Sequence, residues 1–128
     1  MVSAHDTPLL AARLRSQLLS GTPARGPAAV AERLLAVQGQ DPRGVRLAIR
    51  SRSSGISVAA VERALTDERT LVISWLLRGT LHLVRREDHP WLHALTAPRL
   101  LGASQRRLGQ LGVGAAAAER SPSSRAAI

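Results

Sequence analysis

A short apolar stretch, residues 71–77, limits most narrowly what this chain can fold into, because it combines β-branched residues with a length too short for a convincing helix. Elsewhere Leu and Ala dominate, a composition that favours helices. Arg78-Gly79 can turn the chain, and residues 80–84 continue as a second apolar segment. The pattern predicts a β-hairpin. The fold must therefore place one hairpin directly after a series of helices.

Helical patterns account for the residues before the hairpin. Asp6 and Pro8 predict the start of a first helix, which ends before Gly21. A second helix is predicted to start at Pro27, and Gln38-Gly39-Gln40 is expected at its C-terminal end. Its predicted buried stripe consists of Val30, Leu34 and Val37.

Two shorter helices are expected next, joined by a Ser53-Ser54-Gly55 turn. The third helix is predicted over residues 43–50, and Ser57 is expected to cap the fourth. The inward-facing residues of the third are predicted to be Val45, Ala48 and Ile49, and those of the fourth Val58, Val61 and Leu65. This pair, at about residues 43–66, matches the outline of a helix-turn-helix.

After the hairpin, residues 88–111 are predicted to form two closing helices. Asp88 is expected to cap the first of them, and residues 99–111 form the second. Trp75 and Trp91 are expected in the core, and His82 is expected to face the same side of the sheet as Trp75. Residues 112–128 are rich in Ala and Ser and are expected to form a disordered tail.

The predicted order of elements is helix, helix, helix-turn-helix, hairpin and closing helices. This order is typical of a winged helix-turn-helix, a mainly α-helical class in which the hairpin, at about residues 71–84, is the wing. We therefore expect one winged-helix domain over residues 1–111. Such domains usually bind DNA, although many serve only in protein contacts.

The charge balance favours a nucleic-acid partner. The chain carries 18 basic residues, all of them Arg, against 9 acidic ones, for a net charge of +9. Arg43, Arg46 and Arg50 recur at helical spacing and are expected to share one exposed face. The exposed residues of the fourth helix are predicted to be Glu62, Arg63, Thr66 and Asp67. Because that surface is mixed in charge, we expect double-stranded DNA to be held by its backbone, largely independently of sequence. A merely solvated basic surface is the alternative.

Several classes of site are excluded or disfavoured. The absence of Cys excludes disulfides, thiolate catalysis and cysteine zinc sites. Only His89 and His93 share i,i+4 spacing, without a metalloprotease motif around them, so no metal site is expected. No apolar run has the length of a membrane span and no signal peptide is recognisable, so a cytoplasmic protein without a membrane partner is expected.

Gln38 and Gln40 carry the most distinctive chemistry. A carboxamide does not titrate near neutral pH, so neither residue can act as an ordinary general base. It can hold a water molecule or place an oxygen dipole beside a developing positive charge. That repertoire suits cleavage of a glycosidic bond whose leaving group is already cationic, such as an N-alkylated purine. The alternative is a polar helix end, with Asp41 in a capping or turn role.

Three stretches together resemble a bacterial winged-helix family that includes the AlkZ-type DNA glycosylases. They are residues 37–43, with the sequence VQGQDPR, residues 75–84, with the sequence WLLRGTLHLV, and Glu87-Asp88 with Trp91. The resemblance covers roughly residues 7–113 and the N-terminal unit of the family. It implies tandem winged-helix units around a concave DNA-binding face, no metal or organic cofactor, and Gln38 and Gln40 as the catalytic pair. Gly39 departs from the family, which more often has a larger apolar residue there.

The leading hypothesis is a DNA-binding protein resembling the N-terminal part of a glycosylase that hydrolyses the N-glycosidic bond of cationic alkylated purines. Arg43, Arg46, Arg50 and Arg78, the last at the wing tip, are the expected DNA contacts. Two alternatives stay open. One is a non-catalytic DNA-binding or regulatory module, and the other is a truncated, inactive fragment, because the resemblance covers only the first unit.

Overall fold

The hairpin forms as predicted in the computed structural model, which describes residues 6–112. Strands β2 (Leu71–Leu76) and β3 (Thr80–Arg85) pair antiparallel, with Leu76 opposite Thr80. The turn between them has three residues. Leu77 and Gly79 both take positive φ, 55° and 82°, and the Gly79 amide donates to the Leu76 carbonyl at 3.1 Å.

This turn overturns the expected position of His82. A two-residue turn at Arg78-Gly79 would place Trp75 opposite His82, but the three-residue turn places Ser74 there and Trp75 opposite Leu81. Because side chains alternate between the faces of a strand, a shift of one residue moves a side chain to the other face. His82 and Trp75 therefore lie on opposite faces of the sheet.

A third strand, β1 (Val37–Gln38), extends the sheet and corrects the second predicted helix. Helix α2 (Pro27–Leu34) ends several residues earlier than expected, where Leu35 takes a φ of 64°. The chain then pairs antiparallel with β3, giving the order β1-β3-β2. Val37 is buried as predicted, but on a strand, because its pairing with Leu83 outweighs the helical pattern of the local sequence.

The helix-turn-helix consists of α3 (Pro42–Arg50) and α4 (Val58–Thr66). Val45 and Ile49 are buried as predicted, and the Ala60 amide donates to the Ser57 hydroxyl at 3.2 Å as a helix cap. Val58, the first residue of α4, is 43% exposed, contrary to the prediction. Val61 is buried and Leu65 packs against the core as predicted, and Ala64 is buried with them.

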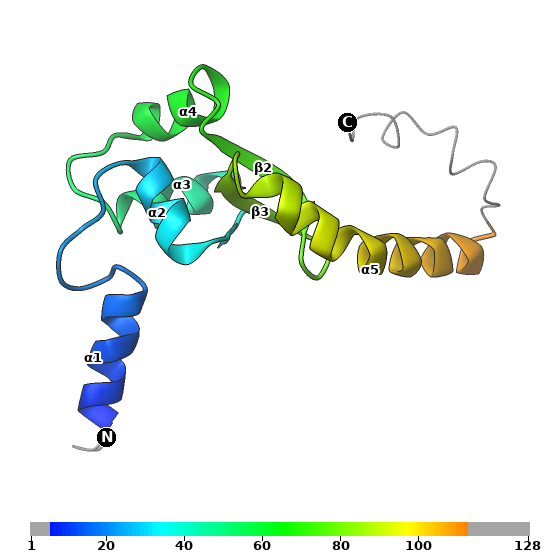
Figure 1. The fold of residues 1–128 in the computed structure, drawn as a ribbon, viewed down its shortest axis with the longest axis horizontal. Coiled ribbons are helices and arrows are strands. Elements are labelled where there is room, and N and C mark those ends of the chain that lie inside the picture. Colours follow the sequence, from blue (N-terminus) through cyan, green and yellow to red (C-terminus); the bar gives the residue numbers. More distant parts are fainter. Residues whose placement is uncertain (1–5, 113–128) are drawn as a thin grey trace.

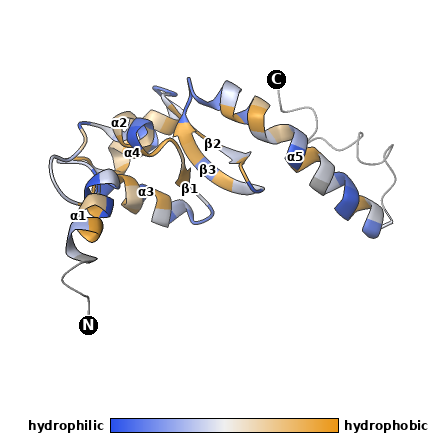
Figure 2. Ribbon diagram, turned by 60° about the horizontal axis from the view of Figure 1, so that its bottom comes forward, coloured by the Kyte–Doolittle hydropathy of each residue, from blue (hydrophilic) through white to orange (hydrophobic). Residues whose placement is uncertain are grey.

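The sheet separates two apolar clusters, and Figure 2 shows apolar residues along the strands and the inner helices. One face packs against α2, α3 and α4. This main cluster comprises Val30, Ala31, Val37, Val45, Ile49, Val61, Ala64, Leu71 and Leu83. The other face packs against the start of α5 (His89–Gln110) through Leu76, Val84 and Leu92. The fold is a winged helix with helices on both faces of its wing (Figure 1).

The two predicted closing helices are one helix. α5 continues through Pro98 and extends away from the body of the domain (Figure 1). Leu95 is 68% exposed, and Trp91 is 47% exposed. Trp75, on the wing, is 57% exposed. The expectation that both tryptophans are core residues is therefore wrong. Trp75 shares a face of β2 with Leu71 and Ile73, which pack in the main cluster, but it lies next to the wing tip, and neither Trp belongs to an apolar cluster.

The first predicted helix is α1 (Asp6–Ser16), which lies apart from the body (Figure 1). Its Leu10 and Leu14 are exposed. The expected tail at residues 112–128 lies outside the described residues, apart from Gly112.

Arg85 connects three elements through ion pairs. Its guanidinium lies 3.2 Å from Glu32 of α2, 2.6 Å from Glu87 and 2.7 Å from Asp88 at the start of α5. The Asp88 carboxylate also accepts a hydrogen bond from the Trp91 indole at 3.2 Å. Asp88 is placed at the helix cap as predicted, but its side chain binds Arg85 and Trp91 and caps no backbone amide. The hydrogen bond from Arg85 lowers the pKa of Asp88 below its ordinary value.

Asp41 caps α3 and fixes the identity of Gly44. The Arg43 amide donates to the Asp41 carboxylate at 2.9 Å. A methyl group added at Gly44 would lie 2.6 Å from the other carboxylate oxygen. Glycine at position 44 thus leaves room for the Asp41 carboxylate, although glycine inside a helix is ordinarily unfavourable.

We predict that Asp88→Asn lowers the free energy of unfolding at neutral pH by about 1–2 kcal/mol, as expected for losing a charged hydrogen bond. Because the folded pKa of Asp88 is depressed, its stabilisation is present above the unfolded value, near 3.9, and is lost as pH falls through the folded value. The deficit of the variant should therefore shrink in acid, measured by thermal unfolding between pH 7 and pH 2. Glu87→Gln is the control, since its carboxylate is 70% exposed and should matter little. An equal loss in both variants would contradict this account.

A double-mutant cycle tests the cap of α3. Replacing glycine by alanine inside a helix usually stabilises by about 0.5–1 kcal/mol. We expect Gly44→Ala to destabilise the natural chain, because the methyl group displaces the Asp41 carboxylate. In an Asp41→Ala background the same substitution should stabilise. Denaturant unfolding of the four proteins measures the sign change, and additive effects would refute the contact.

Candidate nucleic-acid interface and glutamine site

The two glutamines do not end a helix, as the sequence had suggested. Gln38 lies on β1, opposite His82 of β3, and its side chain is exposed. Gly39 is buried against β3, with its amide donating to the Leu81 carbonyl at 2.7 Å. A methyl group at Gly39 would lie 3.6 Å from β3 backbone atoms, which is ordinary contact distance. Pairing with β3 therefore fixes the backbone of the glutamine pair.

Gln40 differs from Gln38 in its hydrogen bonding. The Oε1 atom of Gln40 accepts a hydrogen bond from the Leu81 amide at 2.9 Å. The carboxamide thus replaces the backbone carbonyl that a longer β1 would have offered to β3. Its NH₂ group is not used by this bond. Within residues 6–112, the Gln38 side chain makes no hydrogen bond. Both the oxygen and the NH₂ group of its carboxamide are therefore available to a ligand.

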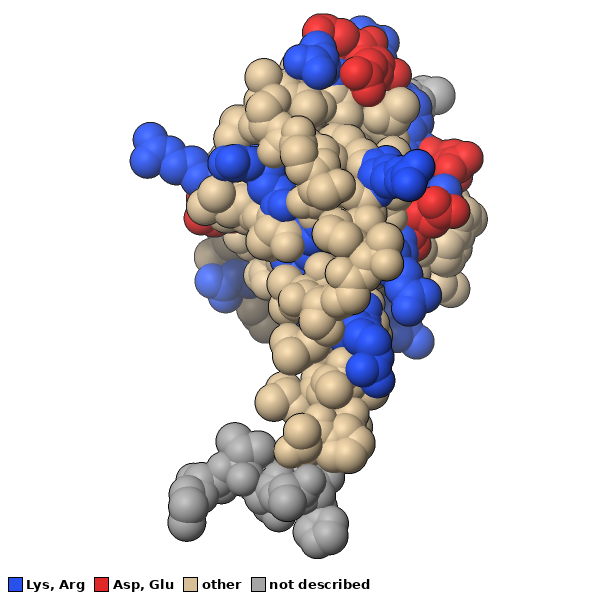
Figure 3. Space-filling view, turned by 90° about the vertical axis from the view of Figure 1, so that its left-hand side faces the viewer, with Lys and Arg blue, Asp and Glu red and all other residues tan. Residues whose placement is uncertain are grey.

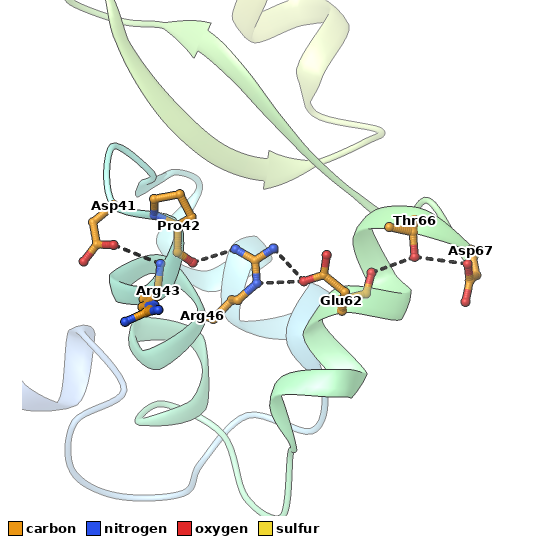
Figure 4. Close-up of polar contacts among 7 residues, drawn as sticks. All are labelled: Asp41, Pro42, Arg43, Arg46, Glu62, Thr66 and Asp67. Carbon is orange, nitrogen blue, oxygen red and sulfur yellow. Dashed lines mark hydrogen bonds and ion pairs between the residues drawn. The ribbon is translucent and has the colours of Figure 1, made fainter.

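The three arginines predicted on α3 are not equivalent. Arg43 and Arg50 are exposed, although the Arg50 Nε donates to the Ile56 carbonyl at 3.2 Å. Arg46 is only 21% exposed, so the expectation of an exposed side chain is wrong for this residue. Its guanidinium donates to Glu62 of α4 at 2.7 Å and to the Pro42 carbonyl at 2.6 Å (Figure 4). Arg46 therefore joins the two helices of the helix-turn-helix.

This pairing changes the surface predicted for α4. Glu62 is half-buried and faces Arg46, so its charge is compensated. The Thr66 hydroxyl lies 3.0 Å from both the Glu62 carbonyl and the Asp67 carboxylate (Figure 4). Arg63 is 56% exposed, and its Nε lies 3.9 Å from Glu68. The outward face of α4 remains mixed in charge, with its acids near its C-terminal end.

Basic side chains spread across the side of the molecule seen in Figure 3. Acidic side chains gather at its upper end and along one margin. Arg78 is exposed at the tip of the wing, between the two positive-φ residues of the turn. A shallow depression of about 720 Å³ lies at the turn of the helix-turn-helix, lined by Leu47, Arg50, Ser51, Ser53, Gly55, Ile56 and Ser57.

The structure brings one unpredicted residue to the glutamine site. His82 is half-buried, and its Nδ1 lies 2.9 Å from the Thr80 carbonyl oxygen. The sequence could reveal its position beside Gln38 only if the turn length and the pairing of β1 were known. His89 and His93 of α5 lie with their ring centroids 5.6 Å apart and their ring planes tilted by 35°. Burial, and then the charge of His93, lowers the pKa of His89.

No cluster of three His, Cys, Asp or Glu side chains within residues 6–112 is placed to hold a metal ion. The helices of the same region are all too short or too polar to cross a membrane.

Comparisons with known proteins place this geometry in a family. The family model for the DNA glycosylase AlkZ-like proteins matches residues 31–128 and so includes the stretch set apart above as a tail. Among solved structures, the Streptomyces sahachiroi DNA glycosylase AlkZ is similar, with 30% sequence identity and a TM-score of 0.52. That match covers 57% of this chain and 19% of the glycosylase chain. No curated protein matches significantly. Because the family model covers most of its length, the chain belongs to the AlkZ-like DNA glycosylase family.

Proposed function

We propose that the chain is a DNA-binding unit of a glycosylase that hydrolyses the N-glycosidic bond of cationic alkylated purines. The observation that carries this proposal is the position of Gln38. Its free carboxamide is exposed on a strand beside the wing, in a chain of the AlkZ-like family. Residues 1–111 would form the first of several winged-helix units around the DNA.

The proposed reaction requires little from the protein beyond positioning a water molecule and a polar group beside the sugar. The bond between the sugar C1′ and the purine nitrogen breaks, and its electron pair neutralises the charge on the leaving base. A water molecule attacks C1′ and loses its proton to solvent. The Gln38 oxygen would hold this water or face the oxocarbenium-like sugar, whose positive charge its dipole stabilises. Gln40 would hold the strand in place through Leu81 and offer its NH₂ group to the substrate.

DNA would be held by exposed arginines. Arg43 and Arg50 of α3 and Arg78 at the wing tip are available for phosphate oxygens. Arg46 adds charge, but its bonds to Glu62 and Pro42 make it a brace between α3 and α4. The mixed face of α4 favours binding that depends little on sequence.

A second candidate is a non-catalytic DNA-binding module. The hydrogen bond from Leu81 to Gln40 favours it, because a carboxamide oxygen used by the fold is less available to a substrate. In this case the arginine contacts persist without base excision.

We predict binding to duplex DNA that weakens steeply with salt and varies little with sequence. Each phosphate contact contributes about −0.9 to the slope of log K against log salt concentration. Arg43→Ala and Arg50→Ala should each reduce the magnitude of the slope by about 1, measured by fluorescence anisotropy. Arg107→Ala, near the far end of α5, carries the same charge change and should leave the slope nearly unchanged. Salt-insensitive binding would refute the proposal.

Base release from a duplex containing N7-methylguanine tests the catalytic reading. We expect Gln38→Ala to reduce release by about 100-fold or more, as for loss of one preorganised polar group. Gln40→Glu keeps an acceptor for the Leu81 amide and removes the NH₂ group, so it separates the anchoring role from the chemical one. If the natural chain binds duplex but releases no base, the non-catalytic module is the correct reading. Release that survives both substitutions removes the pair from the mechanism.

A further inference from the structure

Gln38 and His82 form a non-hydrogen-bonded cross-strand pair, the kind in which the two side chains lie nearest to each other. The Gly39 amide donates to the Leu81 carbonyl, which makes that position a hydrogen-bonded pair of the β1–β3 ladder. In an antiparallel ladder such pairs alternate with non-hydrogen-bonded ones, whose side chains lie nearer to each other. Gln38 and His82 occupy the alternate position. Their side chains therefore leave the same face of the sheet side by side.

The hydrogen bond to Thr80 fixes the tautomer of neutral His82. A carbonyl oxygen only accepts, so the Nδ1 atom at 2.9 Å must carry the proton and donate it. In the neutral imidazole the proton is then absent from Nε2, which becomes a hydrogen-bond acceptor. The wing thus presents an imidazole acceptor on the face that carries Gln38.

A carboxamide can turn either of its ends outward, and the neighbouring group decides which. An acceptor at Nε2 attracts the NH₂ group of Gln38 and leaves its oxygen facing away from the strand. The proposed reaction needs that orientation, because only the oxygen dipole stabilises a positive sugar or accepts a hydrogen bond from water. A donor in place of His82 would favour the opposite orientation.

We propose that His82 is a positioning residue: rotation of the exposed Gln38 side chain, which makes no hydrogen bond as it lies in this structure, brings its NH₂ group to Nε2 of His82 and so directs the Gln38 oxygen toward the substrate. The inference rests on the proposed function of Gln38 and assigns His82 no direct contact with the reacting atoms. The competing partner for Nε2 is the Ser74 hydroxyl, because Ser74 lies opposite His82 on the other neighbouring strand.

The test is a ¹⁵N NMR measurement of the His82 ring in the whole chain, which needs neither DNA nor activity. We expect the neutral tautomer to be protonated at Nδ1. We also expect the Nε2 resonance to move in Gln38→Ala, since Gln38 is exposed and its loss leaves the fold intact. Ser74→Ala is the matched control and should leave that resonance in place. A proton on Nε2, an unchanged resonance in Gln38→Ala, or a change only in Ser74→Ala overturns the proposal.

A comparison of base release by the natural chain and by His82→Asn then tests this inference separately from the proposed function. His82→Asn can retain a donor for the Thr80 carbonyl but lacks the Nε2 acceptor, so release should fall while the thermal midpoint stays near that of the natural chain. Undiminished release in an active protein overturns the positioning role. If the natural chain releases no base, the NMR result still decides whether His82 orients Gln38, and only the proposed function fails.

Discussion

The register of the β2–β3 hairpin is the constraint on which the other features depend. Leu77 enters the turn with positive φ, which makes the turn three residues long and pairs Leu76 with Thr80. This register places Leu71 and Leu83 toward the main helical core, and Leu76 and Val84 toward α5. A slip by one residue would exchange the two faces and leave both clusters without their strand residues. The same register puts His82 on the face that carries Gln38.

Strand β1 links the winged helix to its distinctive chemistry. A two-residue strand is short, and its pairing with β3 is extended by the Gly39 amide and the Gln40 side chain. The second glutamine thereby supports the first, because it fills the hydrogen-bonding position that the departing backbone leaves open. Asp41 then caps α3, so the helix-turn-helix begins only a few residues after the end of β1. The glutamine pair is thus asymmetric, with one carboxamide tied to the fold and one free.

The net charge of +9 overstates the number of arginines available to a ligand. Arg46 and Arg85 each serve as internal connectors, the first between α3 and α4 and the second among α2, β3 and α5. Their carboxylate partners compensate these two positive charges, although Glu32 and Glu87 remain largely exposed. The planar guanidinium suits such multiple contacts, because its donors reach several acceptors in different directions. Exposed positions such as Arg43 and Arg78 remain for an anionic partner.

The sequence by itself determined the fold class and the succession from the first helix through the helix-turn-helix to the hairpin, but not β1 or the single closing helix. The β-branched hairpin, the Ser57 cap and the buried residues Val45 and Ile49 were all predictable, because they follow from local periodicity and capping chemistry. Tertiary structure decided the rest. The strand at Val37, the merger of the closing helices across Pro98 and the exposure of Trp75 depend on contacts between distant segments. The availability of Arg46 depends on its ion pair with Glu62, and the position of His82 depends on the turn length and on the pairing of β3 with β1, which local patterns do not reveal. The sequence thus marked Gln38 and Gln40 as distinctive, whereas only the pairing of β1 with β3 decided that one is an anchor and the other is free.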